Sequence, residues 1–529
     1  MNSGLIRRLP LKALFLALLL ALFLTGVAQA VIQNRKLSGD MVEDGDVYQF
    51  KISPDGKYIV FLADARTDGC YELFSVHTIG SERVLLSSGL SPFAGVVNFY
   101  ISYDSRYVVY SVGSGGINPK QLFSVPISGG TPVELYEAES GDPYISNIRF
   151  SPDSSMVLFR DIIEDPHRES LLSVPIGGGE THTISASEDW CYVAYTITPD
   201  SQYVIYNQSE VGCDDQGLYQ KDLTGGSQII LDDFVRQFKI TPNGEYIIFT
   251  QETDDAESEI FSIPIGGGTK EKLNGTLPSS AKVFDNFVIT PDSAYVIYMA
   301  NEMVLGMKGL YRAPVDGSTT RLNLTPWGDG ITSFKISPDS QWVVYRADFH
   351  EVDKFDLYSV PISGGLWNKL SEGMISEGDV IENRYEIAPN STGVILIADY
   401  VTDNKNELYA VNMTGTWGVK LNGTLPLDGD VIDFRISHNS QGVVYRADQG
   451  VDEVYNLYLV PSVGGISPIR LNPDLVPGGD VGHPLYSYPF DITPDDKGVV
   501  YIADQEDDEV DELFITYDYQ MIYLPMIVN

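Results

Sequence analysis

The chain contains little cysteine, histidine or positive charge. Of its 529 residues, 3 are Cys and 6 are His, and 34 Lys and Arg stand against 73 Asp and Glu, a formal net charge of −39. Three cysteines cannot form a disulfide framework in a chain of this length. So acidic a surface repels phosphate groups, which makes nucleic acid and anionic lipid poor partners and leaves divalent cations and basic partners open.

Long apolar runs are absent after residue 30. Three basic residues precede the uncharged run 13–27, which is shorter than the roughly 20 residues of a membrane-spanning helix, and Ala28-Gln29-Ala30 supplies a small-x-small cleavage pattern. We therefore expect residues 1–30 to be a cleaved signal peptide, residues 31–520 to fold, and residues 521–529 to form an apolar C-terminal tail. The product is expected to be an exported monomer without a membrane span, in the periplasm, at the cell surface or outside the cell.

One phrase recurs ten times along the chain. It reads FKISPDGKYIVF from Phe50, FKITPNGEYIIF from Phe238 and FKISPDSQWVVY from Phe334: an apolar strand, a Ser/Thr-Pro-Asp/Asn turn and a second apolar strand. The first polar residue of each turn, or its counterpart, is Ser53, Ser102, Ser151, Thr198, Thr241, Thr290, Ser337, Ala388, Ser437 and Thr493. A fixed period near 50 residues is typical of an array of supersecondary units.

Each period is predicted to contain four short strands and no helix. In the segment 331–370, ITSFKI, WVVYRA, LYSVPI and LWNKL are rich in β-branched and aromatic residues and are separated by turn residues. Four antiparallel strands per repeat are the sequence pattern of a propeller blade. We predict an all-β fold, a β-propeller of about ten four-stranded antiparallel blades in a single closed ring; the alternative is two smaller propellers, although no linker separates the halves.

The N-terminal segment 33–37 resembles a fourth strand without a third strand before it. Asn34-Arg35-Lys36-Leu37 matches fourth-strand copies such as Val419-Lys420-Leu421. We expect it to complete the last blade beside residues 513–517 and so to fasten the ring. The apolar tail 521–528 is a rival candidate for the same edge.

One position of the first strand alternates in chemistry. The odd repeats carry a base there and the even repeats do not: Lys51, Arg149, Lys239, Lys335 and Arg435 alternate with Tyr100, Thr196, Val288, Glu386 and Asp491. A ring with this alternation closes without mismatch only if the number of blades is even. We expect these bases on the innermost strands, facing the next blade or the channel, with Arg435 pairing with an acid; an ancestral two-blade duplication, or chance, would leave the same pattern.

The repeats resemble those of the TolB-like, WD-repeat-like propellers of exported bacterial proteins. The resemblance rests on the SPDG and TPDS turns, the ELF and LYSVP third strands and the Gly-Gly turns, and it covers about residues 34–517. It implies a periplasmic or extracellular interaction scaffold. The amino-terminal domain of TolB itself has no counterpart here, so a role in the Tol envelope complex is not implied.

Two kinds of site are suggested by residue type. Pairs of acids flank the loops between second and third strands, where carboxylates could bind structural calcium or could instead bond loop amides and face water; they are Asp348, Asp353, Asp399, Asp403, Asp448, Asp452, Asp504 and Asp508. Cys191 and Cys213 belong to one repeat and could form a disulfide in an oxidising compartment, or remain free thiols.

Motifs for catalysis are absent from the sequence. It has no Gly-x-Ser-x-Gly elbow, no zinc-ligand spacing of histidines and no phosphate-binding loop. We therefore favour a non-catalytic scaffold, not an enzyme, that binds an unidentified protein, peptide or glycan without a cofactor, save for a structural calcium ion. The rivals are a calcium-dependent surface or adhesive protein and a propeller enzyme acting on sugar polymers, similar to the oligogalacturonate lyases.

Overall fold

The computed structural model describes most of the chain between residues 33 and 517. Its gaps within that range are 92–93, 115–116, 139–142, 165–166, 188–193, 210–215, 254–255, 280, 303–306, 320, 326–329, 350–352 and 483–488. The described residues form β-strands and no helix, and thus no helix among them could cross a membrane. The expected signal peptide and apolar tail lie outside this part of the chain.

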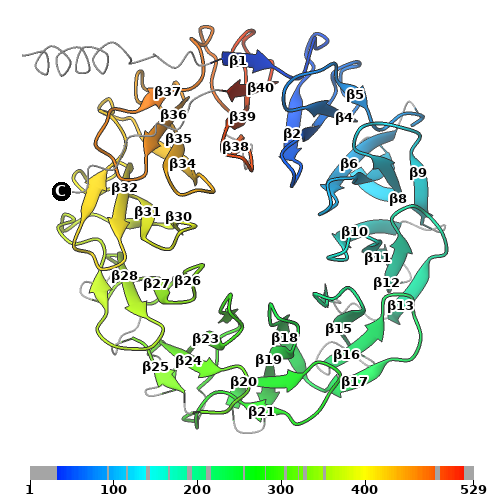
Figure 1. Cartoon of the computed structure of the whole chain (residues 1–529), viewed down its shortest axis with the longest axis vertical. Helices are drawn as coiled ribbons and strands as arrows, with labels where there is room; N and C mark the ends of the chain where they lie inside the picture. The colour runs from blue at the N-terminus through cyan, green and yellow to red at the C-terminus, as the bar shows by residue number, and fades with distance from the viewer. Residues whose placement is uncertain are drawn as a thin grey trace, which may run out of the picture.

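The strands form ten four-stranded antiparallel sheets that stand radially around one centre (Figure 1). The prediction of a ten-bladed β-propeller in one ring is confirmed, and the alternative of two smaller propellers is wrong. We number the blades in chain order, each from its innermost to its outermost strand. The chain runs through blades 1–9 in turn, and each blade uses four consecutive strands.

The strand bounds follow the sequence period closely. Blades 1 to 5 consist of β2 (Val47–Ile52), β3 (Tyr58–Ala63), β4 (Glu72–His77) and β5 (Val84–Leu85); β6 (Ala94–Ile101), β7 (Tyr107–Ser114), β8 (Ile117–Pro126) and β9 (Val133–Glu137); β10 (Pro143–Phe150), β11 (Met156–Glu164), β12 (His167–Pro175) and β13 (His182–Ser187); β14 (Tyr195–Ile197), β15 (Tyr203–Ser209), β16 (Gln216–Asp222) and β17 (Ile229–Asp232); β18 (Val235–Ile240), β19 (Tyr246–Thr253), β20 (Ala256–Pro264) and β21 (Glu271–Lys272).

Blades 6 to 10 repeat the arrangement. They consist of β22 (Val288–Ile289), β23 (Tyr295–Ala300), β24 (Gly309–Pro314) and β25 (Leu322–Asn323); β26 (Ser333–Ile336), β27 (Trp342–Ala347), β28 (Asp356–Pro361) and β29 (Asn368–Lys369); β30 (Val380–Ile387), β31 (Gly393–Ala398), β32 (Glu407–Asn412) and β33 (Gly418–Lys420); β34 (Val431–Ile436), β35 (Gly442–Ala447), β36 (Asn456–Pro461) and β37 (Ile469–Arg470); β38 (Phe490–Ile492), β39 (Gly498–Ala503), β40 (Glu512–Tyr517) and β1 (Gln33–Lys36).

The middle strands are apolar on both faces because each blade is covered by a neighbour on either side. In β27, the last five of six residues are buried, and Tyr345 stacks on Tyr358 of β28 with ring centroids 5.4 Å apart. A sheet with one face in water would alternate apolar and polar residues. The continuous apolar runs in each repeat therefore indicate that the blades stack against one another.

The Ser-Pro-Asp-Ser turn holds the first and second strands of a blade together. In blade 7, Ser337 Oγ donates to Asp339 Oδ1 (2.6 Å) and accepts a hydrogen bond from the backbone N–H of Trp342 (2.9 Å). Ser340 adopts a left-handed φ of 59°, which places its N–H against the carbonyl of Ser337 (2.9 Å). The turn motif recurs because its hydroxyl satisfies these buried polar groups; nine of the ten turns carry a Ser or Thr there, and blade 8 has Ala388 instead.

Blade 10 combines the two ends of the chain. β1 pairs antiparallel with β40, with Gln33 opposite Tyr517 and Lys36 opposite Phe514, and the blue strand lies beside the red blade in Figure 1. Lys36 forms an ion pair with the buried Glu512. The same pair joins third and fourth strands elsewhere, as Lys420 does with Glu407.

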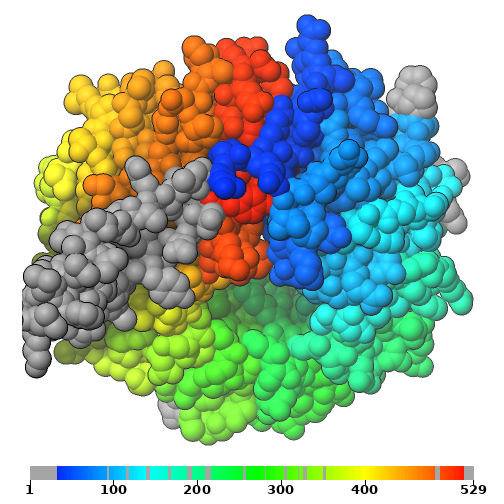
Figure 2. Space-filling model, turned by 45° about the horizontal axis from the view of Figure 1, so that its top comes forward, coloured from blue at the N-terminus to red at the C-terminus, as the bar shows by residue number. Residues whose placement is uncertain are grey.

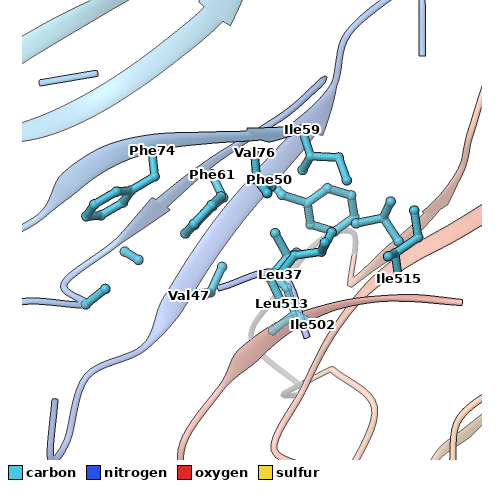
Figure 3. Packing of buried hydrophobic residues seen from close by; sticks show 13 residues of the cluster. Leu37, Val47, Phe50, Ile59, Phe61, Phe74, Val76, Ile502, Leu513 and Ile515 are labelled. Carbon is cyan, nitrogen blue, oxygen red and sulfur yellow. The ribbon is translucent and has the colours of Figure 1, made fainter. Parts of the chain in front are cut away.

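A hydrophobic core joins blade 10 to blade 1 across the closure. Leu37, Leu513 and Ile515 pack against Phe50 and Phe61 (Figure 3). The exposed fraction of Leu37 is only 3%. The residue that follows β1 is thus part of the core that seals the ring.

Candidate ligand pocket on the channel wall

The five alternating bases lie on the innermost strands of the odd-numbered blades and contact the next blade. Lys51 Nζ donates to the carbonyl of Phe99 (2.7 Å), and Lys239 Nζ donates to that of Phe287 (2.6 Å). Each base also stands near the aromatic ring at the matching position of the next blade, at 5.0–5.7 Å from the ring centroid; the pairs are Lys51–Phe99, Arg149–Tyr195, Lys239–Phe287, Lys335–Tyr385 and Arg435–Phe490. For Lys51 and Lys239, cation–π contact and a carbonyl acceptor stabilise the charge without a carboxylate.

Their charges are neutralised on one side of the ring only. Lys335 Nζ forms an ion pair with Glu386 (2.6 Å), and the charge of Arg435 partly offsets the effect of burial, which raises the pKa of Asp491. Within the part of the chain that the structure describes, Lys51 and Arg149 contact only neutral groups. The wall of blades 1–3 is therefore locally basic in a strongly acidic protein.

A cavity of about 440 Å³ opens at this basic wall. The space-filling view shows the ring hollowed at its centre, with the blue and cyan blades along one side (Figure 2). The lining comes from the first strands and turns of three successive blades: Lys51, Ile52 and Pro54 from blade 1, Tyr100, Ile101 and Tyr103 from blade 2, and Ile148, Arg149 and Phe150 from blade 3. We call this cavity the channel pocket.

Three aromatic rings and two bases give the channel pocket its chemistry. Tyr103 is 60% exposed and meets the ring of Phe150 edge-on, with centroids 6.1 Å apart. Arg149 is exposed, and its Nε donates to Asn147 Oδ1 (3.2 Å). An anionic ligand with an apolar face could meet both the bases and the rings here.

Burial shifts the protonation of two groups in the channel pocket. It lowers the pKa of Lys51 below its ordinary value, with no carboxylate to counteract it. Burial also raises the pKa of Tyr100, an effect that the charge of Arg149 reduces. A lysine with a lowered pKa holds more of the neutral amine, which can act as a base or nucleophile.

Lys51 and Arg149 were predicted from the sequence to lie on the innermost strands, but the aromatic residues beside them were not singled out. Tyr103 occupies the position that is proline in most copies of the turn, in the sequence FYISYDSRYVVY. That departure from the turn motif was the signal in the sequence that could have pointed to this residue. The pocket itself could not be read, since it joins side chains about 50 residues apart.

The paired loop acids bond backbone amides. Asp448 Oδ1 accepts from the N–H of Asp430 (2.6 Å), and Asp430 Oδ1 accepts from the N–H of Asn406 in the preceding blade (2.6 Å). Asp399 and Asp504 accept equivalent bonds, whereas Asp348 accepts from the N–H of Asp353 (3.4 Å). The second member of each pair has an exposed side chain: Asp353, Asp403, Asp452 and Asp508.

Among the described residues, no three His, Cys, Asp or Glu side chains converge to hold a metal ion. Calcium binding by the loop acids stays a prediction. Cys191 and Cys213 lie outside the described residues, so the structure does not place their disulfide; Cys70, which is described, is a free thiol.

Comparison with known proteins finds similarity at the level of fold. No protein-family model matches the chain, and no curated protein matches it. The similar solved structures include an oligogalacturonate lyase in complex with manganese (12% identity, TM-score 0.36, covering 72% of this chain and 96% of that chain). They also include a prolyl endopeptidase (10%, 0.38, 67% and 54%) and TolB from Acinetobacter baumannii (15%, 0.29, 61% and 81%). This chain spans about half the length of the prolyl endopeptidase.

These matches correct the expectation of a non-catalytic scaffold that is not an enzyme. That expectation is wrong: the propellers found include oligogalacturonate lyases and prolyl endopeptidases, which are enzymes, and none of the findings supports a scaffold. The prediction of a non-catalytic protein failed because it relied on the absence of local catalytic motifs from the sequence. A site assembled from several blades leaves no contiguous motif, so the sequence could not exclude catalysis. At these identities the likeness shows the fold alone, and the reaction has to be argued from this chain's own residues.

Proposed function

We propose that this chain is an enzyme that cleaves acidic oligosaccharides by β-elimination, with the channel pocket as its active site. The observation that carries the proposal is the placement of Lys51 and Arg149, two bases without a carboxylate partner among the described residues, beside Tyr103 and Phe150 in one cavity. A cavity of this size lies within the range of roughly 300–1,000 Å³ that small-molecule sites occupy. Carboxylates suit the bases, and the apolar faces of sugar rings suit the aromatic residues.

In this reaction, Arg149 holds the carboxylate of a uronate ring. The neutral amine of Lys51 takes the proton from the ring carbon next to that carboxylate, and the electrons form a C=C double bond as the C–O bond to the leaving sugar breaks. The leaving oxygen takes a proton from water, and the hydroxide that remains takes the proton from Lys51, which restores the neutral amine. One sugar chain thus becomes an unsaturated chain and a second chain with a new hydroxyl end. The lowered pKa of Lys51 supports its role as the base.

The manganese named for the similar lyase has no matching ligand set among the residues described here. No step of the proposed reaction is therefore assigned to a metal. We also propose that the repeats are of the TolB-like type and that the enzyme is exported after cleavage of residues 1–30, which N-terminal sequencing of the secreted protein would test.

The test is a lyase assay on uronate polymers that follows the ultraviolet absorbance of the new double bond. Lys51→Met should lower turnover by about 100-fold or more, the contribution expected of a general base, and Arg149→Gln should raise KM. Lys239→Met is the matched control, since Lys239 has the same carbonyl and ring contacts and a pKa lowered by burial but lies outside the channel pocket. Absence of product from every uronate polymer, or equal losses for the Lys51 and Lys239 variants, would overturn the proposal.

A further inference from the structure

The last residue of each first-to-second-strand turn adopts a left-handed backbone conformation. Eight of the ten residues at this position carry a side chain, with φ between 57° and 63°: Ser105, Ser154, Ser201, Ser293, Ser340, Ser391, Ser440 and Asp496. This conformation costs free energy for any residue with a Cβ atom, and glycine is its natural occupant. A side chain kept at eight such positions indicates that it does something that glycine cannot.

In these eight cases the side chain forms a hydrogen bond across the junction between two blades. Ser105 Oγ of blade 2 accepts from the backbone N–H of Asp55 in blade 1 (3.0 Å), and Ser340 Oγ of blade 7 accepts from that of Asp292 in blade 6 (3.1 Å). The other serines accept in the same way, from Asp104, Asp153, Asn243, Asp339 and Asn390. At the junction of blades 9 and 10, the carboxylate of Asp496 accepts from His438 and Asn439. We call this bond the turn latch.

Two junctions cannot form the turn latch, because glycine occupies the position. They are Gly56 at the junction of blades 10 and 1 and Gly244 at that of blades 4 and 5, with φ of 71° and 73°. In each case a Cβ would lie 3.3 Å from the proline of the preceding blade, Pro494 or Pro199. The turns otherwise keep the same arrangement, so these two junctions lack only the side-chain acceptor.

We infer that the ring has two built-in seams, at blades 10/1 and 4/5, which divide it into a body of blades 1–4 and a body of blades 5–10. At the first seam the opposite face stays tied, because Val47 N–H donates to the carbonyl of Asp511 (2.8 Å) and Asp511 N–H donates to Asp46 (2.8 Å). The turn face is therefore the less tied side of this junction, and motion there leaves the hydrophobic core between blades 10 and 1 in place. Such motion changes the width of the channel. The two seams thus form a conformational device around the channel, and this inference does not depend on which ligand the channel binds.

The inference is tested by hydrogen exchange of the full-length protein, resolved to the turn fragments by mass spectrometry. The amides of Asp200 and Asp495 face the seams and should exchange at least about five-fold faster than the latched amides of Asp292 and Asp339, the ratio expected for one hydrogen bond. Gly56→Ser and Gly244→Ser introduce the acceptor in a turn that already has the left-handed conformation. Each should slow exchange at its own seam and leave the other seam unchanged.

Ser340→Gly is the matched control, since it removes one latch without inserting any atom. It should raise exchange at Asp292 to the level of the seams, and it remains informative if a new serine clashes with the proline. Equal exchange at latched and seam amides, or a serine-to-glycine change without effect at Asp292, would overturn the inference. Neither result bears on the lyase assay, so the two proposals fail separately.

Discussion

Replacing Lys36 by methionine should destabilise the protein by removing the partner of a buried charge at the ring closure. The side chain of Glu512 is 2% exposed and that of Lys36 is 24% exposed. Breaking a fully buried ion pair costs about 3–5 kcal/mol, and the partial exposure of Lys36 lowers the expected loss to about 2–3 kcal/mol. Burial raises the pKa of Glu512 above its ordinary value even with Lys36 in place, and the loss of Lys36 should raise that pKa further.

The assay is chemical denaturation at neutral pH and at a pH near the raised pKa of Glu512. A carboxyl whose pKa is higher in the folded than in the unfolded state destabilises the fold when ionised, so lowering the pH should recover part of the loss. The second change Glu512→Gln should also recover it at neutral pH. Lys420→Met is the matched control, because its pair with Glu407 joins strands within one continuous blade. A loss for Lys36→Met below about 0.5 kcal/mol, the scale of a surface pair, or a loss that persists unchanged with Glu512→Gln, would refute the reasoning.

Three further predictions concern one core leucine and two aspartates. Leu37→Ala should cost about 2–5 kcal/mol, the usual penalty for truncating a buried leucine, because Leu37 is sealed between blades 10 and 1; calorimetry checks this, and a change within error would contradict the closure. Asp430→Asn should raise stability at neutral pH, since burial and the neighbouring Asp448 raise the pKa of Asp430 and Asn keeps the acceptor for Asn406; its gain should vanish as the pH falls through the raised pKa. Asp495→Asn should lower stability at neutral pH. Burial would raise the pKa of Asp495, but the bonds from Thr493 and Lys497 outweigh it and lower that pKa. Denaturation at several pH values should therefore show that the stability present above the ordinary pKa range of Asp in the wild type is missing in the variant.

The architecture was predictable because each blade repeats the same pattern of turns and apolar strands. A turn of the Pro-Asp type or a close variant follows each first strand, and the apolar second and third strands indicate coverage on both faces, as in β27. The ring closure was also suggested, since Lys36 and Leu37 repeat a fourth-strand pattern. These features are local, so one sequence suffices to read them.

The channel pocket and the seams depend on neighbours that are distant in the chain. Tyr103 and Phe150 meet only because consecutive blades stack. The glycines of SPDG and TPNG look like ordinary turn residues until Ser105 is seen to bond the preceding blade. The sequence suggested the loop acids as candidate calcium ligands, but it could not show that Asp448 accepts a hydrogen bond from the backbone amide of Asp430, 18 residues away.

The most direct measurement is a crystal structure of the protein soaked with a uronate trisaccharide. The account predicts one closed ring of ten blades, with a sugar carboxylate within hydrogen-bond distance of the Arg149 guanidinium, a ring carbon facing Lys51 Nζ, and a sugar face against the exposed ring of Tyr103. A trisaccharide bound elsewhere, or a channel pocket that stays empty at saturating ligand, would contradict it.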